Sequence, residues 1–352
     1  MYINGIGTAT PAARFTKAQC WEAFRRSDWF SRLDPRARAI AQTVLLGDNG
    51  MEARWLALDS LAEVFRIDPD TLHRRFLAHA PRLAARAAER ALSEAQLGAA
   101  ELDAVVVSTC TGYLCPGLSG YLIEALGLKP SALAFDLVGQ GCAAAVPNMR
   151  LGQALLGSGQ CRQVLSVCVE VSSAAMYLDS DPGVMVSACL FGDGAGAAVL
   201  SGAAQPHRRR VLWADSESLI DARHRDALKF EQRGGMLRNV LTREVPALAA
   251  ELSQRVLRAV LERARLEAAQ MSAWIVHAGG PDVLRSMQRR LGLEPQDLRY
   301  SAAMLRQYGN LSSAFVYFVL QSALADRAPA GWWWLCSFGA GFSCHGALLQ
   351  VD

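Results

Sequence analysis

Two distant segments of this 352-residue chain share a pattern of glycine turn and apolar strand. The first reads FGDGAGAAVLSG from Phe191, and the second reads FGAGFSCHGALLQ from Phe338. In each, Phe-Gly-x-Gly precedes a run of small and apolar residues, which is typical of a tight turn opening a buried strand. We interpret them as the ends of two copies of an α/β unit of about 150 residues, a common domain size. The copies would span residues 1–204 and 205–352. The alternative is a chance match, because glycine turns are common.

The elements predicted between these segments support a layered α/β fold. In the first copy, residues 102–108 are apolar at nearly every position, as strands buried on both faces are, and residues 163–173 predict a further buried strand. For the second copy we predict a helix over 245–266, a strand over 272–277, a helix over 281–291, a helix from Asn310 to Leu324 and a strand over 331–337. Strands that alternate with helices are typical of α/β proteins.

Composition narrows the classes of function. Hydrophobic residues make up 51% of the chain and the formal net charge is only +3, so a nucleic acid partner is not indicated. No apolar run is long enough to span a membrane, and the N-terminus does not read as a signal peptide. We therefore expect a soluble, cytoplasmic protein. The basic run Arg208 to Arg210, preceded by His207, is expected to be a solvated loop.

The nine cysteines form an odd set without a paired C-x-x-C module. This pattern predicts neither a metal site nor a disulfide framework, and it fits free thiols in a reducing compartment. The set consists of Cys20, Cys110, Cys115, Cys142, Cys161, Cys168, Cys189, Cys336 and Cys344.

Cys142 stands at a junction between two kinds of structure. The residues around Phe135 predict a short buried strand, Gly139-Gln140-Gly141 ends it, and a helix of small residues is expected to open at Cys142. Unpaired backbone N–H groups and the helix dipole at that place favour a thiolate. The simpler interpretation is a small buried hydrophobic residue.

His277 and Asn310 are candidate partners of Cys142. His277 lies between a predicted strand and the turn Ala278-Gly279-Gly280-Pro281, where glycines allow close approach to the ring. Asn310 opens a predicted helix and could simply cap it. Together the three residues offer a thiolate nucleophile, a histidine that stabilises it and an amide donor.

A Cys-His-Asn set suits two classes of reaction. In a papain-like hydrolase the amide orients the histidine. In a condensing enzyme the histidine and the amide hold a substrate carbonyl while an enolate forms after loss of carbon dioxide. The sequence around Cys142 lacks the C-G-[SA]-C-[WY] context of papain-like enzymes, so condensation is the better fit.

Over essentially its whole length the chain resembles the type III polyketide synthases, the chalcone- and stilbene-synthase-like enzymes of the thiolase superfamily. The segments STCTGYLCPG, GQGCAAA, LFGDGAGA, HAGGP and YGNLSSA carry the resemblance in this order. The first of them is most similar to the bacterial branch that includes alkylpyrone and alkylresorcinol synthases.

The resemblance implies a homodimer with a duplicated αβαβα sandwich that uses coenzyme A thioesters as substrates and needs no cofactor. It implies that Cys142 carries the acyl chain, and that His277 and Asn310 bind the malonyl thioester carbonyl. Phe191 matches the gatekeeper phenylalanine between the coenzyme A tunnel and the cavity. Cys110 and Thr111 match residues that line the cavity, and Cys115 matches a position that reaches across the dimer interface.

Three positions depart from the family pattern: Ala145 where many members have glycine, the turn FGAGF where plant members have a glycine-proline turn, and Asn239 near a second gatekeeper phenylalanine of plant enzymes. They leave the three catalytic candidates intact and bear on the shape of the cavity.

We expect decarboxylative condensation of malonyl-CoA onto an acyl-CoA starter, more specifically a fatty acyl one, followed by cyclisation to an alkylpyrone or alkylresorcinol. The alternatives are a single-round enzyme similar to ketoacyl-ACP synthase III, fed by an acyl carrier protein, and a catalytically silent partner subunit with the same fold. A thioester hydrolase is the remaining alternative.

Overall fold

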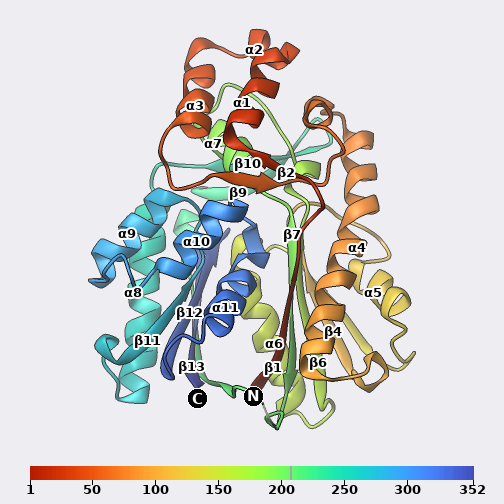
Figure 1. The fold of residues 1–352 in the computed structure, drawn as a ribbon, viewed down its shortest axis with the longest axis vertical. Helices are drawn as coiled ribbons and strands as arrows, with labels where there is room; N and C mark the ends of the chain where they lie inside the picture. The colour runs from red at the N-terminus through yellow and green to blue at the C-terminus, as the bar shows by residue number, and fades with distance from the viewer. Residues whose placement is uncertain (207) are drawn as a thin grey trace.

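The computed structural model describes residues 1–206 and 208–352, and nine of its strands form one mixed sheet (Figure 1). In spatial order the strands are β11 (Met271–Val276), β12 (Gly331–Gly339), β13 (Ser343–Val351), β8 (Val211–Ile220), β1 (Tyr2–Ala9), β7 (Gly194–Ser201), β6 (Gln163–Glu170), β4 (Ala104–Ser108) and β5 (Leu133–Leu137). Two hairpins stand apart from this sheet: β2 (Arg14–Thr16) with β3 (Ala53–Trp55), and β9 (Leu228–Arg233) with β10 (Met236–Leu241).

The strand order is symmetric about the neighbours β1 and β8. The order β1-β7-β6-β4 on one side corresponds to β8-β13-β12-β11 on the other. In both, the second strand is antiparallel to its neighbours and the last two strands are parallel. The halves meet in the single register pair Tyr2–Leu212, and β5 extends only the first half. The predicted duplication is therefore confirmed in the topology, while the boundary at residue 204, between β7 and β8, stays a prediction.

Some of the helices form three layers, which alternate with the two half-sheets to give five layers in all. Eleven helices lie among the described residues. They are α1 (Lys17–Arg26), α2 (Asp28–Arg32), α3 (Pro35–Leu46), α4 (Pro69–Ala95), α5 (Leu118–Leu126), α6 (Ala145–Gly157), α7 (Pro182–Leu190), α8 (Val245–Ala264), α9 (Pro281–Leu291), α10 (Arg299–Tyr308) and α11 (Phe315–Ala325).

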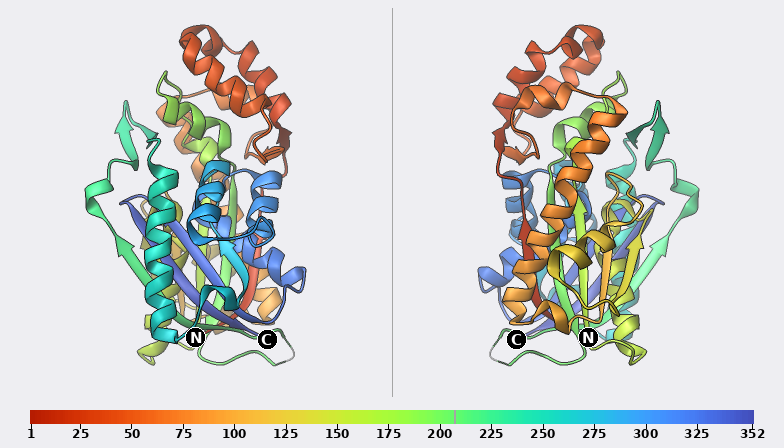
Figure 2. Two further views of the ribbon diagram at one scale, coloured as in Figure 1. Left: turned by 90° about the vertical axis from the view of Figure 1, so that its left-hand side faces the viewer. Right: turned by 90° about the vertical axis from the view of Figure 1, so that its right-hand side faces the viewer.

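Helices α6 and α11 form the middle layer, because each contacts strands of both halves. Met149 of α6 and Phe315 and Leu320 of α11 are almost completely buried there. Helices α4 and α5 cover the outer face of the first half-sheet, and α8 and α9 lie outside the second (Figure 1). The expected αβαβα sandwich is thus confirmed. Figure 2 shows α1 to α3 standing above this body and the β9–β10 hairpin projecting from its side.

Three sequence predictions need correction. The strand before Cys142 is not buried, because β5 is the edge strand and has only β4 as a neighbour; Leu133 is 37% exposed. The helix predicted from Asn310 begins at Phe315, because Ser312 has a φ of 51° and opens a separate 3₁₀ turn over Ser312–Ala314. Cys142 likewise lies in a 3₁₀ turn, Gly141–Ala143, ahead of α6.

The described part of the basic run after β7 lies outside any helix or strand, and Arg208 and Arg210 are exposed, as expected of a solvated loop. Arg208 pairs with Glu94 at 3.1 Å, and Arg209 donates to the backbone oxygen of Asp352 at 2.7 Å. The guanidinium of Arg209 also lies 5.0 Å from the ring centre of Trp333. The arginines therefore tie the connection between the halves to the C-terminal strand. His207 lies outside the described residues.

Candidate active site

The turn that carries Cys142 depends on two glycines with left-handed backbone. Gly139 has a φ of 82° and Gly141 a φ of 54°, values that glycine adopts without steric cost. A side chain at Gly141 would meet the Cβ of Ala340 at 3.1 Å. The turn therefore reverses the chain directly after β5 and places Cys142 against the second half of the protein, where it is only 8% exposed.

The glycine turn of the second half packs on the backbone of the nucleophile. A Cβ atom on Gly339 would lie 2.7 Å from the amide nitrogen of Ala143 and 3.0 Å from that of Cys142. The hydroxyl of Ser337 also donates to the carbonyl oxygen of Ala143 at 2.8 Å. The segment FGAGF, which departs from the family pattern, is thus in direct contact with the turn of Cys142.

His277 follows β11 and is almost completely buried, with 1% of its surface exposed. Its ring packs edge-on against Phe315 and Phe338, with centroid distances of 5.4 and 5.0 Å. Among the described residues, its Nδ1 atom has no hydrogen-bond partner. Burial lowers the pKa of His277 to about 3, so the imidazole is neutral near pH 7.

Asn310 is held in one orientation by its neighbours. Its Nδ2 donates to the carbonyl oxygen of Gly279 at 3.1 Å, and its Oδ1 accepts from the amide of Ser312 at 2.8 Å. One hydrogen of the Nδ2 group remains available as a donor, because an amide nitrogen carries two. The side-chain oxygen of Asn310 thus satisfies a backbone donor of the turn that follows, while the role of its nitrogen as a donor to substrate stays a prediction.

All three predicted catalytic residues line one cavity of about 110 Å³. Cys142 comes from the turn before α6, His277 from the end of β11 and Asn310 from the segment before α11. Apolar side chains surround them, including Leu190, Val283 and Phe338. Residues far apart in the sequence thus meet in a largely apolar site, which strengthens electrostatic contacts within it.

Phe191 lies between this cavity and a second, smaller one of about 30 Å³, because it lines both. It ends α7 and forms a parallel bridge with Asn310, in which the amide of Gly192 donates to the carbonyl oxygen of Asn310 at 2.9 Å. Cys110 and Thr111 also line the second cavity. The gatekeeper role of Phe191 stays a prediction.

Cys115 lies apart from these residues. It is exposed on the loop between β4 and α5, and it is not among the residues that line either cavity. The nearby Tyr113 is 73% exposed. Such a loop is free to contact another molecule, and the role of Cys115 at a dimer interface stays a prediction.

Sequence reasoning missed two polar residues beside Cys142. The hydroxyl of Ser312 donates to the Sγ of Cys142 at 3.2 Å. Glu170 ends β6, is fully buried, and accepts from the amide of Cys110 at 3.1 Å and from the hydroxyl of Thr111 at 2.9 Å. A signal was present, because Glu170 is a charged residue within an otherwise apolar strand, and such residues are seldom buried without a role.

The protonation of Cys142 differs from the expectation of a thiolate. Burial raises the pKa of the Cys142 thiol to about 12, the hydrogen bond from Ser312 lowers it, and the charge of Glu170 raises it. The expected dipole of a helix opening at Cys142 is weakened, because α6 begins only at Ala145. Cys142 and His277 are therefore a neutral pair in the free protein.

Among the described residues, no group of three histidine, cysteine or acidic side chains is arranged to hold a metal ion. No helix in the described part of the chain has the length and apolar character of a membrane span.

Comparisons with known proteins agree along the whole chain. The family model described as "Chalcone and stilbene synthases, N-terminal domain" matches residues 3–205, and the corresponding C-terminal model matches residues 216–351. A 3,5-dihydroxyphenylacetyl-CoA synthase of Amycolatopsis balhimycina is 29% identical over 357 residues, with 98% of this chain and 92% of the relative covered.

Solved structures show the same fold. PKS-I from the brown alga Ectocarpus siliculosus superposes with a TM-score of 0.89 at 25% identity, covering 99% of this chain and 98% of the other. The 1,3,6,8-tetrahydroxynaphthalene synthase of Streptomyces coelicolor A3(2) has a TM-score of 0.89 at 23% identity, covering 99% of each chain. The chain therefore belongs to the chalcone and stilbene synthase family, the type III polyketide synthases, and is a condensing acyltransferase-type enzyme of the thiolase fold.

Proposed function

We propose that this enzyme transfers an acyl group from coenzyme A to Cys142 and extends it with malonyl-CoA. The observation that carries the proposal is the meeting of Cys142, His277 and Asn310 in one largely apolar cavity. The neutral imidazole of His277 accepts the thiol proton as Cys142 attacks the starter thioester. It then passes this proton to the departing coenzyme A thiolate, so that free coenzyme A leaves and His277 is neutral again. His277 needs no metal or cofactor for this step.

The same site then forms the carbon–carbon bond. The N–H groups of His277 and Asn310 bind the malonyl thioester carbonyl, so that loss of carbon dioxide leaves a stabilised enolate. The enolate carbon attacks the acyl carbonyl on Cys142, the new bond forms, and the bond to sulfur breaks to release the thiolate. The extended chain returns to Cys142 for the next round.

A fatty acyl starter is supported by apolar space beyond the gatekeeper. The cavity of about 30 Å³ behind Phe191 shares Met176 and Ala188 with a further cavity of about 40 Å³. Apolar side chains line that further cavity: Phe24 and Leu45 from the α1–α3 region, and Leu61, Val64 and Phe65 from the turn that precedes α4. An alkyl chain can gain free energy by filling such space, at about 0.8 kcal/mol for each buried methylene group. We therefore propose cyclisation products that carry an alkyl chain, an alkylpyrone or an alkylresorcinol.

A second candidate follows from the relative in Amycolatopsis, whose name gives a dihydroxyphenylacetyl-CoA as its product. This enzyme would then build an aromatic ring without a long alkyl chain. A product formed from malonyl-CoA alone, and still bound to coenzyme A, would favour this candidate over the fatty acyl one.

The partner and the compartment are proposals as well. β5 is an open sheet edge, and Leu133, Val138 and Tyr113 near it are 37%, 67% and 73% exposed. An open edge with exposed apolar side chains suits pairing with a second copy, so we propose a homodimer. The nine unpaired cysteines fit the reducing cytoplasm.

The test is incubation of the purified enzyme with malonyl-CoA and a panel of acyl-CoA starters, followed by mass spectrometry of the products and of Cys142. We expect an acyl adduct on Cys142 and products that grow by malonyl-derived units, and both should disappear in Cys142→Ala. Cys168→Ala is the matched control. Cys168 is buried on β6 and lines neither of the two cavities between which Phe191 lies.

Further reactions run in parallel distinguish this function from the alternative ones. Faster reaction with acyl carrier protein donors and one condensation per turnover would indicate an enzyme similar to ketoacyl-ACP synthase III. Thioester cleavage without chain growth would indicate a hydrolase. A lack of any adduct on Cys142 would contradict the proposal and support a silent subunit.

A further inference from the structure

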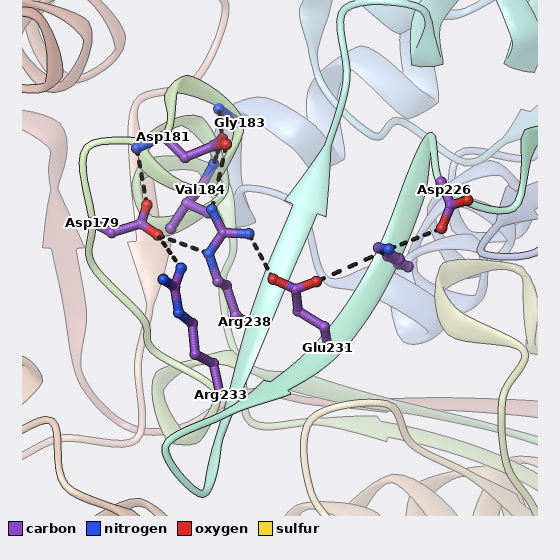
Figure 3. A network of polar contacts seen from close by, with 9 residues as sticks. Asp179, Asp181, Gly183, Val184, Asp226, Glu231, Arg233 and Arg238 are labelled. Carbon is purple, nitrogen blue, oxygen red and sulfur yellow. Dashed lines mark hydrogen bonds and ion pairs between the residues drawn. The ribbon is translucent and has the colours of Figure 1, made fainter.

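A cluster of ion pairs joins the β9–β10 hairpin to the loop before α7 (Figure 3). At its centre is Arg238 of β10, which is only 8% exposed. Its Nε donates to Asp179 at 2.7 Å and its Nη1 to Glu231 at 2.9 Å, while Nη2 lies 3.3 Å from Asp181. One guanidinium thus holds carboxylates from two separate parts of the chain.

The two elements that Arg238 joins are walls of the cavity behind the gatekeeper. Phe230 and Asn239 are opposite each other in the hairpin and both line the cavity of about 30 Å³ behind Phe191. Helix α7 contributes Val184, Ser187 and Ala188 to the same cavity. The next cross-strand pair of the hairpin is Glu231 with Arg238, so its side chains point to the other face. One face of the hairpin therefore lines the cavity and the other holds the ion pairs.

Helix α7 is fixed at both ends. At its start, the Asp181 carboxylate caps the helix by accepting from the amides of Gly183 at 2.8 Å and Val184 at 3.3 Å. At its end, Phe191 is bridged to Asn310. The hairpin, in contrast, is a separate two-stranded sheet without backbone pairing to the nine-stranded sheet among the described residues. At its base the hairpin nevertheless packs on α7 through backbone, because a Cβ atom on Gly183 would lie 2.1 Å from the carbonyl oxygen of Leu241. Farther along the hairpin, the distance to α7 depends on side-chain contacts.

Among the side-chain contacts between the hairpin and the α7 loop, those of Arg238 carry the most charge. It faces three carboxylates, those of Asp179, Asp181 and Glu231. Other cations lie farther away: Arg233 is 3.8 Å from Asp179, and Lys229 is 4.0 Å from Glu231. Loss of the guanidinium would leave like charges on the hairpin and on the α7 loop facing each other, and these repel.

We propose that Arg238 is a positioning residue that sets the width of the cavity between the hairpin and α7, and thereby limits the number of malonyl units added. The inference rests on the proposed function. Arg238 lines neither of the two cavities that Phe191 separates, so it acts on the growing chain through Phe230 and Asn239, its neighbours in the hairpin.

The test compares Arg238→Gln, Arg238→Lys and Arg233→Gln with the wild type. Arg233 belongs to the same cluster, but its side chain is 62% exposed and its ion pair is long, so its loss should have little effect. For each folded variant, verified by its thermal melting curve, we measure the rate of Cys142 acylation and the mass distribution of the products.

We expect Arg238→Gln to acylate Cys142 within about twofold of the wild-type rate, while the ratio of longer to shorter products rises about fivefold or more. The reason is that the repelled hairpin widens the cavity. Arg238→Lys should lie between this variant and the wild type, because an ammonium keeps the charge but not the forked contacts. Arg233→Gln should match the wild type.

A product ratio unchanged or shifted to shorter products in Arg238→Gln would overturn the inference, as would a shift of equal size in Arg233→Gln. If Arg238→Gln does not fold, a wild-type product ratio in folded Arg238→Lys would overturn it equally. A wild type that makes no malonyl-dependent product contradicts the proposed function instead, so the two failures are distinguishable.

Discussion

The hydroxyl of Ser312 donates a hydrogen bond to the Sγ atom of Cys142, over 3.2 Å. Ser312 comes from the second half of the chain and Cys142 from the first, so the fold itself creates this contact. The hydrogen bond stabilises the thiolate more than the thiol, and it opposes the effect of burial on the pKa of Cys142.

Ser312→Ala should therefore raise the pKa of Cys142. A hydrogen bond to a charged group contributes about 1.5–3 kcal/mol, so the rise should be about one pH unit or more. The measurement is the rate of Cys142 alkylation by iodoacetamide as a function of pH. Ser166→Ala is the control, because Ser166 is a buried serine of β6 whose hydroxyl lies 2.9 Å from that of Tyr317. Equal pH profiles for the wild type and Ser312→Ala would refute the assignment.

We expect the free energy of unfolding to fall at acid pH, because His277 is buried in its neutral form. Its pKa is lowered from 6.5 to about 3 by burial, so the unfolded chain binds a proton in this range while the folded chain does not. The neutral imidazole therefore adds its full contribution to the free energy of unfolding above pH 6.5, and this contribution is lost as the pH falls toward 3. In urea unfolding, His277→Gln should flatten the pH dependence by up to about 1.4 kcal/mol per pH unit.

Cys168→Ala serves as the comparison for this experiment, because the pKa of Cys168 is raised to about 12 and the thiol does not titrate in the acid range. It should keep the wild-type slope. A wild-type slope in His277→Gln would show that the imidazole is not held neutral in the folded protein.

Ala188 lies where the two cavities that are proposed to hold the alkyl chain meet. Ala188→Phe should block the passage and lower kcat/KM for long acyl-CoA starters by about tenfold or more relative to short ones. Met176→Ala should shift the preference in the opposite direction, because Met176 lines the same two cavities. Parallel changes for short and long starters in both variants would argue against this path.

Gly339→Ala should disturb the turn of Cys142. The added methyl group would lie 2.7 Å from the amide nitrogen of Ala143, a steric conflict that typically costs about 1–3 kcal/mol. We expect a lower unfolding free energy together with slower acylation of Cys142. Gly157→Ala is the matched variant, because no atom lies within 4 Å of its added methyl group. It should be neutral or stabilising by up to about 1 kcal/mol. Wild-type acylation by Gly339→Ala would contradict this account.

The elements themselves were largely predictable. Helix α9 has the predicted bounds 281–291, and the runs that became β4 and β6 were predicted to be buried strands. That these two strands pair in parallel was not predicted. The wrong predictions arose where the backbone conformation of one residue, or the position of a strand in the sheet, overrides the local pattern of apolar residues. Ser312 breaks the helix predicted from Asn310. β5 is exposed because it is the edge strand of the sheet. A short apolar run does not show whether a strand lies at an edge or in the centre, so β5 was wrongly predicted to be buried.

The sequence by itself determined the set of chemical groups: a thiol after a glycine turn, a histidine after a buried strand and an asparagine before a helix, in two similar halves. Short-range spacing and residue type suffice for these, because they depend on local backbone geometry. Only the tertiary structure decided that Cys142, His277 and Asn310 share one cavity, and that Ser312 contacts Cys142.

Tertiary structure also decided the protonation of the site and the place of Arg238. Burial makes Cys142 and His277 a neutral pair, and burial is a property of the whole packed chain. Arg238 gathers carboxylates from a distant loop and from the neighbouring strand. Such long-range contacts leave no periodic signal in the sequence, because they arise only when separate elements pack together.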